Sequence, residues 1–466
     1  MVNIQSLIQF LKKHKLKSLF TFCLIMFYAA AISIFMHVTS KNFMKIEVNC
    51  VSHVGIIKSF QGVNNGPLSE DGNVDLSKYY QEAGFRYIRL HDFFTLAGAV
   101  DIHRVFPNFD ADPLVAENYN FTETDKNIQA IISIGAEIIY RLGYSWEDNP
   151  VHNVPPKDNL KWATICIQII KHYNDGWANG HNYDIEYWEI WNEPDITQFW
   201  TGTAEEYCQL YDITAKEIKS YNPNLKVGGP ALAWNITFLD QFLKYCKTNN
   251  VPIDFISWHA YSKEPYDIYF RAEKVHECMK NNGFSSIESL LTEWNFQPGE
   301  NYEIEFKSSK VAAFIASTMI YLQDNPPDIA TFYRGDTWPW GGLFDKNGVP
   351  HKAYYVFMAF KMLIETPNRL LCTGSNSKGF AVIAGISPNN ETVTILISNF
   401  GFEFNGYNLR ISDLPFEEGR FRLELYAIDS EEDFDLIKSD VYDTAKLEIE
   451  QTMKRYAVHL VRLIRE

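Results

Sequence analysis

The chain has 466 residues, and 46% of them are hydrophobic, which is enough for the core of one large domain and a smaller companion. The formal net charge of −16 comes without a basic stretch beyond the N-terminus, which excludes nucleic acid as the expected partner. The hydrophobic content also excludes a chain that is disordered throughout.

The N-terminal segment differs in composition from the rest of the chain. Four lysines between residues 12 and 17 precede an uncharged run from residue 18 to residue 38. This run is long enough to cross a bilayer, which takes about 20 apolar residues. We expect residues 1–40 to form a cytoplasmic basic segment and a signal-anchor helix, with the rest of the chain outside the cytoplasm. A cleaved signal peptide, which would make the protein secreted, is the alternative.

Between residues 56 and 365, short apolar runs alternate with amphipathic segments of helical length, which favours a closed (β/α)8 barrel, the TIM barrel. The expected strands are Ile56–Gly62, Arg86–Leu90, Glu137–Leu142, Ile185–Trp191, Lys226–Gly229, Phe255–His259, Leu290–Glu293 and Thr331–Arg334. The segment Thr203–Glu206 has the pattern of a capping box, so we expect a helix to begin there. An open, doubly wound sheet is the alternative, although no Gly-rich phosphate loop follows the first expected strand.

The pattern changes near residue 366. Apolar and polar residues alternate at Phe421–Leu425, and Ser387–Asn390 predicts a hairpin turn. We expect residues 366–466 to form a small antiparallel β-sandwich. Ile46, Val48 and Cys50 also alternate with polar residues, and residues 41–55 are expected to add one or more strands to that domain.

Two glutamates stand at the C-terminal ends of expected strands. Glu193 lies in the tetrapeptide Trp191–Pro194 after the fourth strand, and Glu293 ends the seventh. The C-terminal ends of barrel strands share one face, where active sites lie, so the two side chains should meet there. Cleavage of a glycosidic bond needs such a pair, with one carboxyl group ionised and one protonated. Structural roles, as helix caps or arginine partners, are the alternative, and we expect Glu189 to be a structural partner of an arginine.

Several motifs in fixed order support this interpretation. They are Gln61–Pro67, Tyr87–His91, Tyr187–Pro194, Leu225–Pro230, Phe255–Tyr261 and Leu291–Asn295. Together they resemble glycoside hydrolase family 39, which contains β-xylosidases and α-L-iduronidases and belongs to a clan of retaining (β/α)8 glycosidases. The resemblance runs from about residue 44 to residue 365, and the trailing β domain fits it too.

The resemblance implies roles for the two carboxyl groups. Glu193 would be the acid/base and Glu293 the nucleophile of a double displacement with net retention, which requires carboxyl groups about 5–5.5 Å apart. Arg89 and Tyr261 would hold Glu293 in its ionised form through hydrogen bonds that lower its pKa.

The resemblance also implies sugar-binding residues. Asn192 would hydrogen-bond the 2-hydroxyl of the sugar, and His91 and His259 would bind other hydroxyls. A histidine that is satisfied within the core is the alternative for His259.

The segment after the eighth expected strand departs from the xylosidase pattern. Tyr333, Trp338 and Trp340 are candidates for the aromatic floor of the sugar pocket, and Trp338 is included among the predicted substrate-binding residues. Arg334 either meets a uronate carboxylate, which a guanidinium binds with two hydrogen bonds, or pairs with Asp336.

Metal ligands are not expected, because no His, Asp and Cys residues have metal-ligand spacing; His152, His172 and His181 are expected in loops or on the surface. The sequence predicts a retaining glycoside hydrolase, β-xylosidase-like, that cleaves oligosaccharides or polysaccharides without a cofactor. The alternatives are an endo-acting glycan hydrolase or transglycosylase at the membrane surface, and a non-catalytic carbohydrate-binding protein.

Overall fold

The computed structural model describes residues 5, 12, 43–92, 100–416 and 420–466. Apart from two single residues, the predicted anchor over residues 1–40 lies outside this part of the chain. None of the helices within the described ranges is long and apolar enough to cross a membrane.

Eight parallel strands close into a barrel in the order in which they occur along the chain. They are β2 (Gly62–Asn64), β3 (Tyr87–Leu90), β4 (Glu137–Leu142), β5 (Tyr187–Ile190), β6 (Lys226–Leu232), β7 (Phe255–Ser262), β8 (Glu288–Phe296) and β9 (Ile329–Phe332). Because β2 pairs with both β3 and β9, the ring has no free edge. The predicted TIM barrel is therefore confirmed, and the open sheet is wrong.

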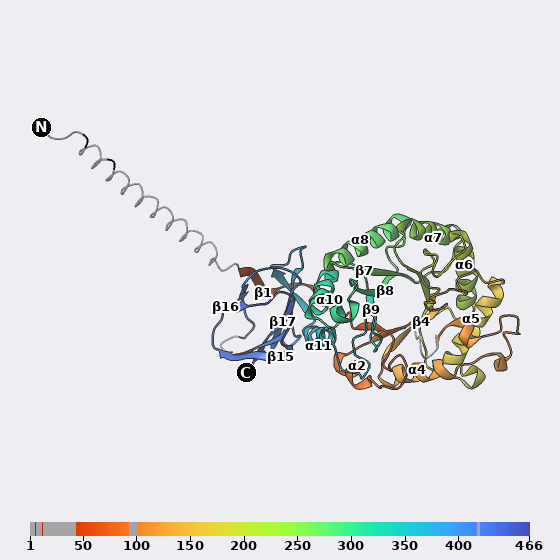
Figure 1. The fold of residues 1–466 in the computed structure, drawn as a ribbon, viewed down its shortest axis with the longest axis horizontal. Helices are drawn as coiled ribbons and strands as arrows, with labels where there is room; N and C mark the ends of the chain where they lie inside the picture. Colours follow the sequence, from red (N-terminus) through yellow and green to blue (C-terminus); the bar gives the residue numbers. More distant parts are fainter. Residues whose placement is uncertain (1–4, 6–11, 13–42, 93–99, 417–419) are drawn as a thin grey trace.

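Helices surround the barrel on its outside (Figure 1). They are α2 (Ser77–Ala83), α4 (Thr122–Ser133), α5 (Asn159–Asn174), α6 (Ala204–Tyr221), α7 (Ile236–Thr248), α8 (Pro265–Asn282), α10 (Ser309–Tyr321) and α11 (Lys352–Ile364), with the short α3 (Ile102–Val105) and α9 (Tyr302–Phe306) between them. The capping box at the start of α6 is confirmed. The Thr203 hydroxyl accepts from the Glu206 amide, and the Glu206 carboxylate accepts from the Thr203 amide.

A second, β-rich domain lies beside α10 and α11 (Figure 1). Its strands are β1 (Phe43–Ile56), β10 (Asn368–Thr373), β11 (Phe380–Ile386), β12 (Thr392–Asn399), β13 (Gly406–Ser412), β14 (Phe421–Ile428), β15 (Asp433–Tyr442), β16 (Leu447–Thr452) and β17 (Ala457–Arg465). They form one sheet in the order β15-β14-β17-β12-β11-β10-β1-β13-β16. Leu423 of β14 and Ile449 of β16, near opposite ends of this order, share one apolar core, so the sheet curls round on itself.

Two expectations about the strands were wrong. The first barrel strand is not Ile56–Gly62, because β1 continues through Ile56 and the barrel begins at Gly62. The β domain is not wholly antiparallel, because β1 pairs with β13 in parallel. No hairpin fixes the direction of β1 against β13, since the whole barrel separates these two strands in the sequence.

Candidate active site

The C-terminal ends of the barrel strands surround a cavity of about 520 Å³, a size that suits a small ligand. Its lining residues come mostly from the segments that follow the strands, and they are His91, Asp92, Trp146, Asp148, Asn192, Glu193, Phe199, Tyr261, Glu293, Tyr333, Trp338 and Trp340. Six of the eight predicted site residues are among them, and the other two, Arg89 and His259, are completely buried.

Glu293 lies at an irregular point of β8. The pairing between β7 and β8 skips Thr292, so that His259 faces Glu293 across the ladder. Such a bulge re-aims the neighbouring side chain. The Thr292 carbonyl is held in place because it accepts a hydrogen bond of 2.8 Å from the Asn64 side chain.

Glu193 lies in a sharp turn just after β5. Trp191 and Glu193 have φ angles of 74° and 45°, a region that side chains with a Cβ rarely adopt. The Glu193 amide donates to the Ala231 carbonyl at 3.0 Å and so fixes the turn. In a continuous strand, Glu189 and Glu193 would point to the same face, because side chains alternate every two residues. Strand β5 ends at Ile190, so this rule does not apply to Glu193.

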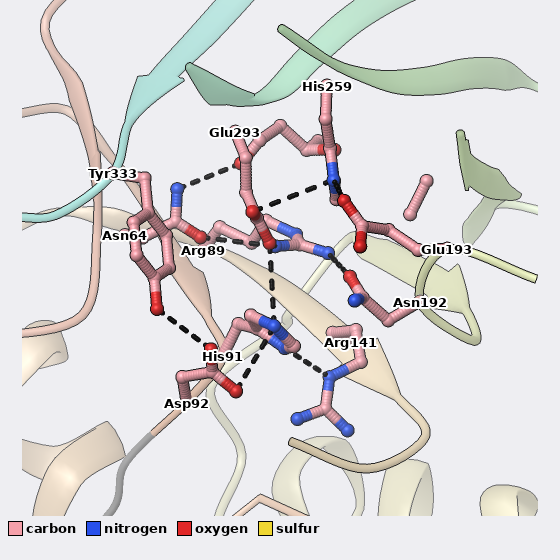
Figure 2. Close-up of polar contacts among 12 residues, drawn as sticks. Asn64, Arg89, His91, Asp92, Arg141, Asn192, Glu193, His259, Glu293 and Tyr333 are labelled. Atoms are coloured by element: carbon pink, nitrogen blue, oxygen red, sulfur yellow. Dashed lines mark hydrogen bonds and ion pairs between the residues drawn. The ribbon is translucent and has the colours of Figure 1, made fainter. Parts of the chain in front are cut away.

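The two carboxyl groups meet in the cavity, next to the ring of His259 (Figure 2). A carboxylate oxygen of Glu193, one of Glu293 and a ring nitrogen of His259 all lie within 4.8 Å of one another. This closeness fits the short separation that a retaining reaction uses, of about 5–5.5 Å, rather than the about 6.5–9.5 Å of an inverting one.

Arg89, which is completely buried, connects this pair to the barrel interior. Its Nη1 donates to Glu293 at 2.7 Å, its Nη2 to Asn192 at 2.8 Å and its Nε to Glu189 at 2.6 Å. The Tyr261 hydroxyl donates to the other Glu293 oxygen at 2.7 Å. Both oxygens of Glu293 thus accept a hydrogen bond, and Glu189 has the arginine partner that was expected.

The pKa of Glu293 differs from the expected direction. Burial raises the pKa of this carboxyl to about 7, although the Arg89 charge and the Tyr261 hydrogen bond act to lower it. The two residues thus act in the expected direction, but the net pKa is raised because desolvation outweighs them. Burial and the charge of Glu293 raise the pKa of Glu193 well above its usual range. Glu193 consequently retains its proton in conditions where Glu293 is ionised.

His259 has a different position from the one expected of a sugar ligand. Its ring is completely buried and does not line the cavity, and its Nδ1 lies 2.6 Å from Oε1 of Glu193. Burial and the Arg89 charge lower the pKa of His259 well below its usual range, so the ring is neutral. His259 thus contacts Glu193 in place of a sugar hydroxyl.

His91 lines the cavity, as predicted. Its Nδ1 accepts a hydrogen bond of 3.1 Å from Arg141, so in the neutral ring Nε2 carries the hydrogen. That Nε2 lies 3.4 Å from Glu293 and 3.2 Å from Asp92. Burial and the Arg141 charge lower the pKa of His91 well below its usual range, so the ring acts as a neutral donor toward the two carboxyl groups.

Asp92 was missed in the sequence, although it is only the second residue after a predicted strand. Its carboxylate accepts from the Tyr333 hydroxyl at 2.8 Å and from the Trp146 amide at 2.7 Å. Burial raises its pKa. Trp146, Asp148 and Phe199 were also missed, because they lie in loops whose paths no periodic pattern predicts.

The segment after β9 resolves the two alternatives for Arg334. Nε of Arg334 donates to Oδ1 of Asp336 at 2.7 Å, and Nη2 of Arg334 donates to Oδ2 of Asp336. Both side chains are completely buried. Arg334 therefore pairs with Asp336. The three aromatic candidates, Tyr333, Trp338 and Trp340, all line the cavity together.

The remaining histidines differ in burial. His172 is 2% exposed within α5, so the expectation of a loop or surface residue was wrong for this side chain. It lies on the buried side of α5 and contacts Asp125 of α4. The sequence alone does not show that this polar partner is nearby.

Comparisons with known proteins agree with the geometry. The family model of "Glycosyl hydrolases family 39" matches residues 41–321. A β-xylosidase of Geobacillus stearothermophilus is 32% identical over 318 residues, which is 60% of this chain and 60% of that enzyme. A β-xylosidase of Caldicellulosiruptor saccharolyticus is 27% identical over 410 residues, which is 77% of this chain and 79% of that enzyme.

A solved structure extends the likeness to the β domain. The crystal structure of a glucosidase from Croceicoccus marinus has a TM-score of 0.80 and 25% sequence identity, and the match covers 92% of this chain and all of that one, 100%. The family match itself ends at residue 321, before β9 and the segment that carries Arg334 and Trp338. With the family model spanning more than half of its residues, the chain belongs to glycosyl hydrolases family 39.

Proposed function

We propose that this protein is a retaining glycosidase, β-xylosidase-like, that acts on oligosaccharides or polysaccharides. The observation that carries the proposal is the carboxyl pair: Glu193 and Glu293 lie within 4.8 Å of each other in a cavity, and their surroundings differ. The two curated relatives with β-xylosidase activity point to the same reaction.

The different surroundings of the two carboxyl groups support a different role for each. Glu293, which accepts hydrogen bonds from Arg89 and Tyr261, is the more easily ionised carboxyl and attacks the anomeric carbon. Glu193, which holds its proton longer, gives that proton to the leaving oxygen. In the second step Glu193 takes a proton from water, and this water releases the sugar from Glu293 with net retention. Asn192 lines the cavity beside them, which supports its proposed hydrogen bond to a sugar hydroxyl.

The charges in the cavity favour a neutral sugar over a uronate. Among the described residues that line it, four are acidic and none is Lys or Arg. Arg334 forms an ion pair with Asp336. Residues 93–99, which the structure does not describe, include no charged residue in the sequence. A uronate carboxylate would therefore meet negative charge without a guanidinium to bind it. This argues against an α-L-iduronidase-like activity.

A panel of 4-nitrophenyl glycosides tests the proposal. We expect turnover of a xyloside. A glucoside and an arabinoside are tested as alternative substrates, and an iduronide is the uronate control. Proton NMR of the first product should show retained anomeric configuration, and an inverted first product would contradict the proposal. Binding without turnover across the panel would support the non-catalytic alternative. Release of internal fragments from polysaccharides would support the endo-acting one.

We also infer that residues 1–40 anchor the chain in a membrane with the catalytic domain outside the cytoplasm. The lysines before an uncharged run support this orientation. Membrane fractionation and protease treatment of intact cells test it, since an extracytoplasmic domain would be digested. Recovery of a shortened chain from the medium would instead support cleavage.

A further inference from the structure

A group of polar side chains lies apart from the catalytic cavity. The group consists of Asp125 of α4, His172 of α5 and His181 of the loop before β5. One possible ligand atom of each residue lies within 4.8 Å of those of the other two. None of the three residues lines the catalytic cavity. The reaction proposed above uses none of them.

The distances in this group match those of metal ligands. Nε2 of His172 lies 2.9 Å from Oδ1 of Asp125, and Nε2 of His181 lies 3.7 Å from the same oxygen. Ligand atoms around a tetrahedral zinc ion, with bonds of about 2.0 Å, are about 3.3 Å apart. The two measured distances lie on either side of this value.

The protonation of His172 gives an independent reason for a cation. Its Nδ1 lies 2.9 Å from the carbonyl oxygen of Trp177. Since a carbonyl can only accept, Nδ1 must carry a hydrogen, and Nε2 of the neutral ring then has only a lone pair. That lone pair faces a carboxylate oxygen of Asp125 at 2.9 Å. A cation between these two atoms would be bound by both of them, in a place where the His172 ring is only 2% exposed.

His181 favours the cation over the proton. A cation would contact both imidazoles and the carboxylate, whereas a proton on His172 would contact only one imidazole and Asp125. The two rings are perpendicular, at 89°, so they approach the carboxylate from different directions. The hydrogen bond from Nδ1 of His172 to the Trp177 carbonyl is the outer contact that orients metal-bound histidines.

Both rings are held in place without a metal. His172 stacks on Phe121 with ring centroids 3.5 Å apart, and His181 stacks on Tyr183 at 4.5 Å. The His181 amide donates to the His172 carbonyl at 2.6 Å. A Cβ atom at Gly180 would lie 2.0 Å from that carbonyl oxygen, so the loop can approach His172 this closely only with glycine there.

We propose that Asp125, His172 and His181 bind one zinc ion, with water as the fourth ligand. Two imidazoles and a carboxylate suit zinc and similar divalent transition metals better than Mg²⁺ or Ca²⁺. The ion joins α4, α5 and the loop that leads into β5, the strand that precedes Glu193. A bound ion would therefore stabilise the packing of these three segments.

A second histidine group offers a matched control. His103, Glu147 and His152 also lie within 4.8 Å of one another through their possible ligand atoms. Their two rings are stacked, however, at 3.7 Å and 11°, so the lone pairs point side by side and do not converge on one point. His152→Ala therefore removes a histidine of similar exposure without touching the proposed site.

The experiment measures metal in the full-length chain, purified without a polyhistidine tag after growth with zinc. We expect about one zinc per chain in the wild type and in His152→Ala, and a loss to below about one tenth in His181→Ala. Chelation should lower the Tm of the wild type, and added zinc should restore it, with no such change in His181→Ala. Cobalt in place of zinc should give the visible absorption of a tetrahedral site.

His181 is partly exposed, so its removal should leave the chain folded, and Asp125→Asn provides a second variant. Wild-type protein that holds no zinc and takes up no cobalt would overturn the proposal. Zinc that persists in His181→Ala but is lost in His152→Ala would also overturn it. These readouts do not depend on glycosidase activity.

Discussion

Nδ1 of His259 lies 2.6 Å from Oε1 of Glu193, in a ring that is completely buried behind the cavity. The same nitrogen lies 3.6 Å from Oε2 of Glu293. His259 thus contacts both carboxyl groups without lining the cavity, and it positions Glu193 relative to Glu293. A substitution of His259 should therefore change kcat more than KM.

Replacing His259 with Gln should lower kcat and leave KM almost unchanged. We expect a loss of up to about 10²-fold on substrates with poor leaving groups, at the lower end of what general acid catalysis contributes. Steady-state kinetics on aryl xylosides of graded leaving ability would measure this, with His276→Gln, at a partly exposed position on α8, as a control. A raised KM with unchanged kcat would show that the ring binds substrate after all.

Replacing Glu193 with Gln should discriminate between leaving groups. Activated aryl glycosides need little proton donation in the first step, whereas alkyl glycosides and xylo-oligosaccharides need much, so the loss in kcat/KM should be about 10²–10⁴-fold only for the second group. A plot of log kcat/KM against leaving-group pKa should become steep in this variant. Equal losses in kcat/KM for all substrates would contradict the acid role.

The pH dependence of kcat/KM should be bell-shaped. Burial raises the pKa of Glu293 to about 7, and the nucleophile must be ionised, so the rate should rise as pH increases through about 7. It should fall at higher pH, where Glu193 loses its proton. Tyr261→Phe removes a hydrogen bond to the ionised form of Glu293, so its rising limb should move to higher pH. A shift of that limb to lower pH would contradict the assignment.

The buried pair of Arg334 and Asp336 should matter for stability. Asp336→Asn leaves the Arg334 charge without its buried partner, which costs about 3–5 kcal/mol of unfolding free energy. Glu448→Gln is the control, since Glu448 and Arg410 form an ion pair at 2.9 Å with side chains 61% and 62% exposed. Such an exposed pair contributes about 0–1 kcal/mol. Urea denaturation of both variants would measure the difference, and equal losses would contradict the burial argument.

The barrel and the carboxyl pair were predictable because both depend on short-range patterns. Alternating apolar runs and helical stripes predicted eight strand–helix units, and the barrel rule then placed Glu193 and Glu293 on one face. The pairing of Glu189 with an arginine followed from its inward position. All of these features can be inferred without knowing how distant segments pack.

Other features depend on packing between distant segments. The bulge at Thr292 exists because β7 and β8 differ by one residue in their pairing, which neither strand reveals alone. The raised pKa of Glu293 results from burial that many segments create together. Asp125 and His172 are 47 residues apart, so no spacing rule could bring them together. The parallel pairing of β1 with β13 is hidden for the same reason.

The configuration of the azide product formed by Glu293→Ala tests the central claim most directly. This variant should lose almost all turnover, and added azide should occupy the space of the lost carboxylate and attack the anomeric carbon directly. We predict a glycosyl azide whose anomeric configuration is inverted relative to the substrate, as shown by proton NMR. An azide product of retained configuration, or a variant that keeps full activity without azide, would contradict the account.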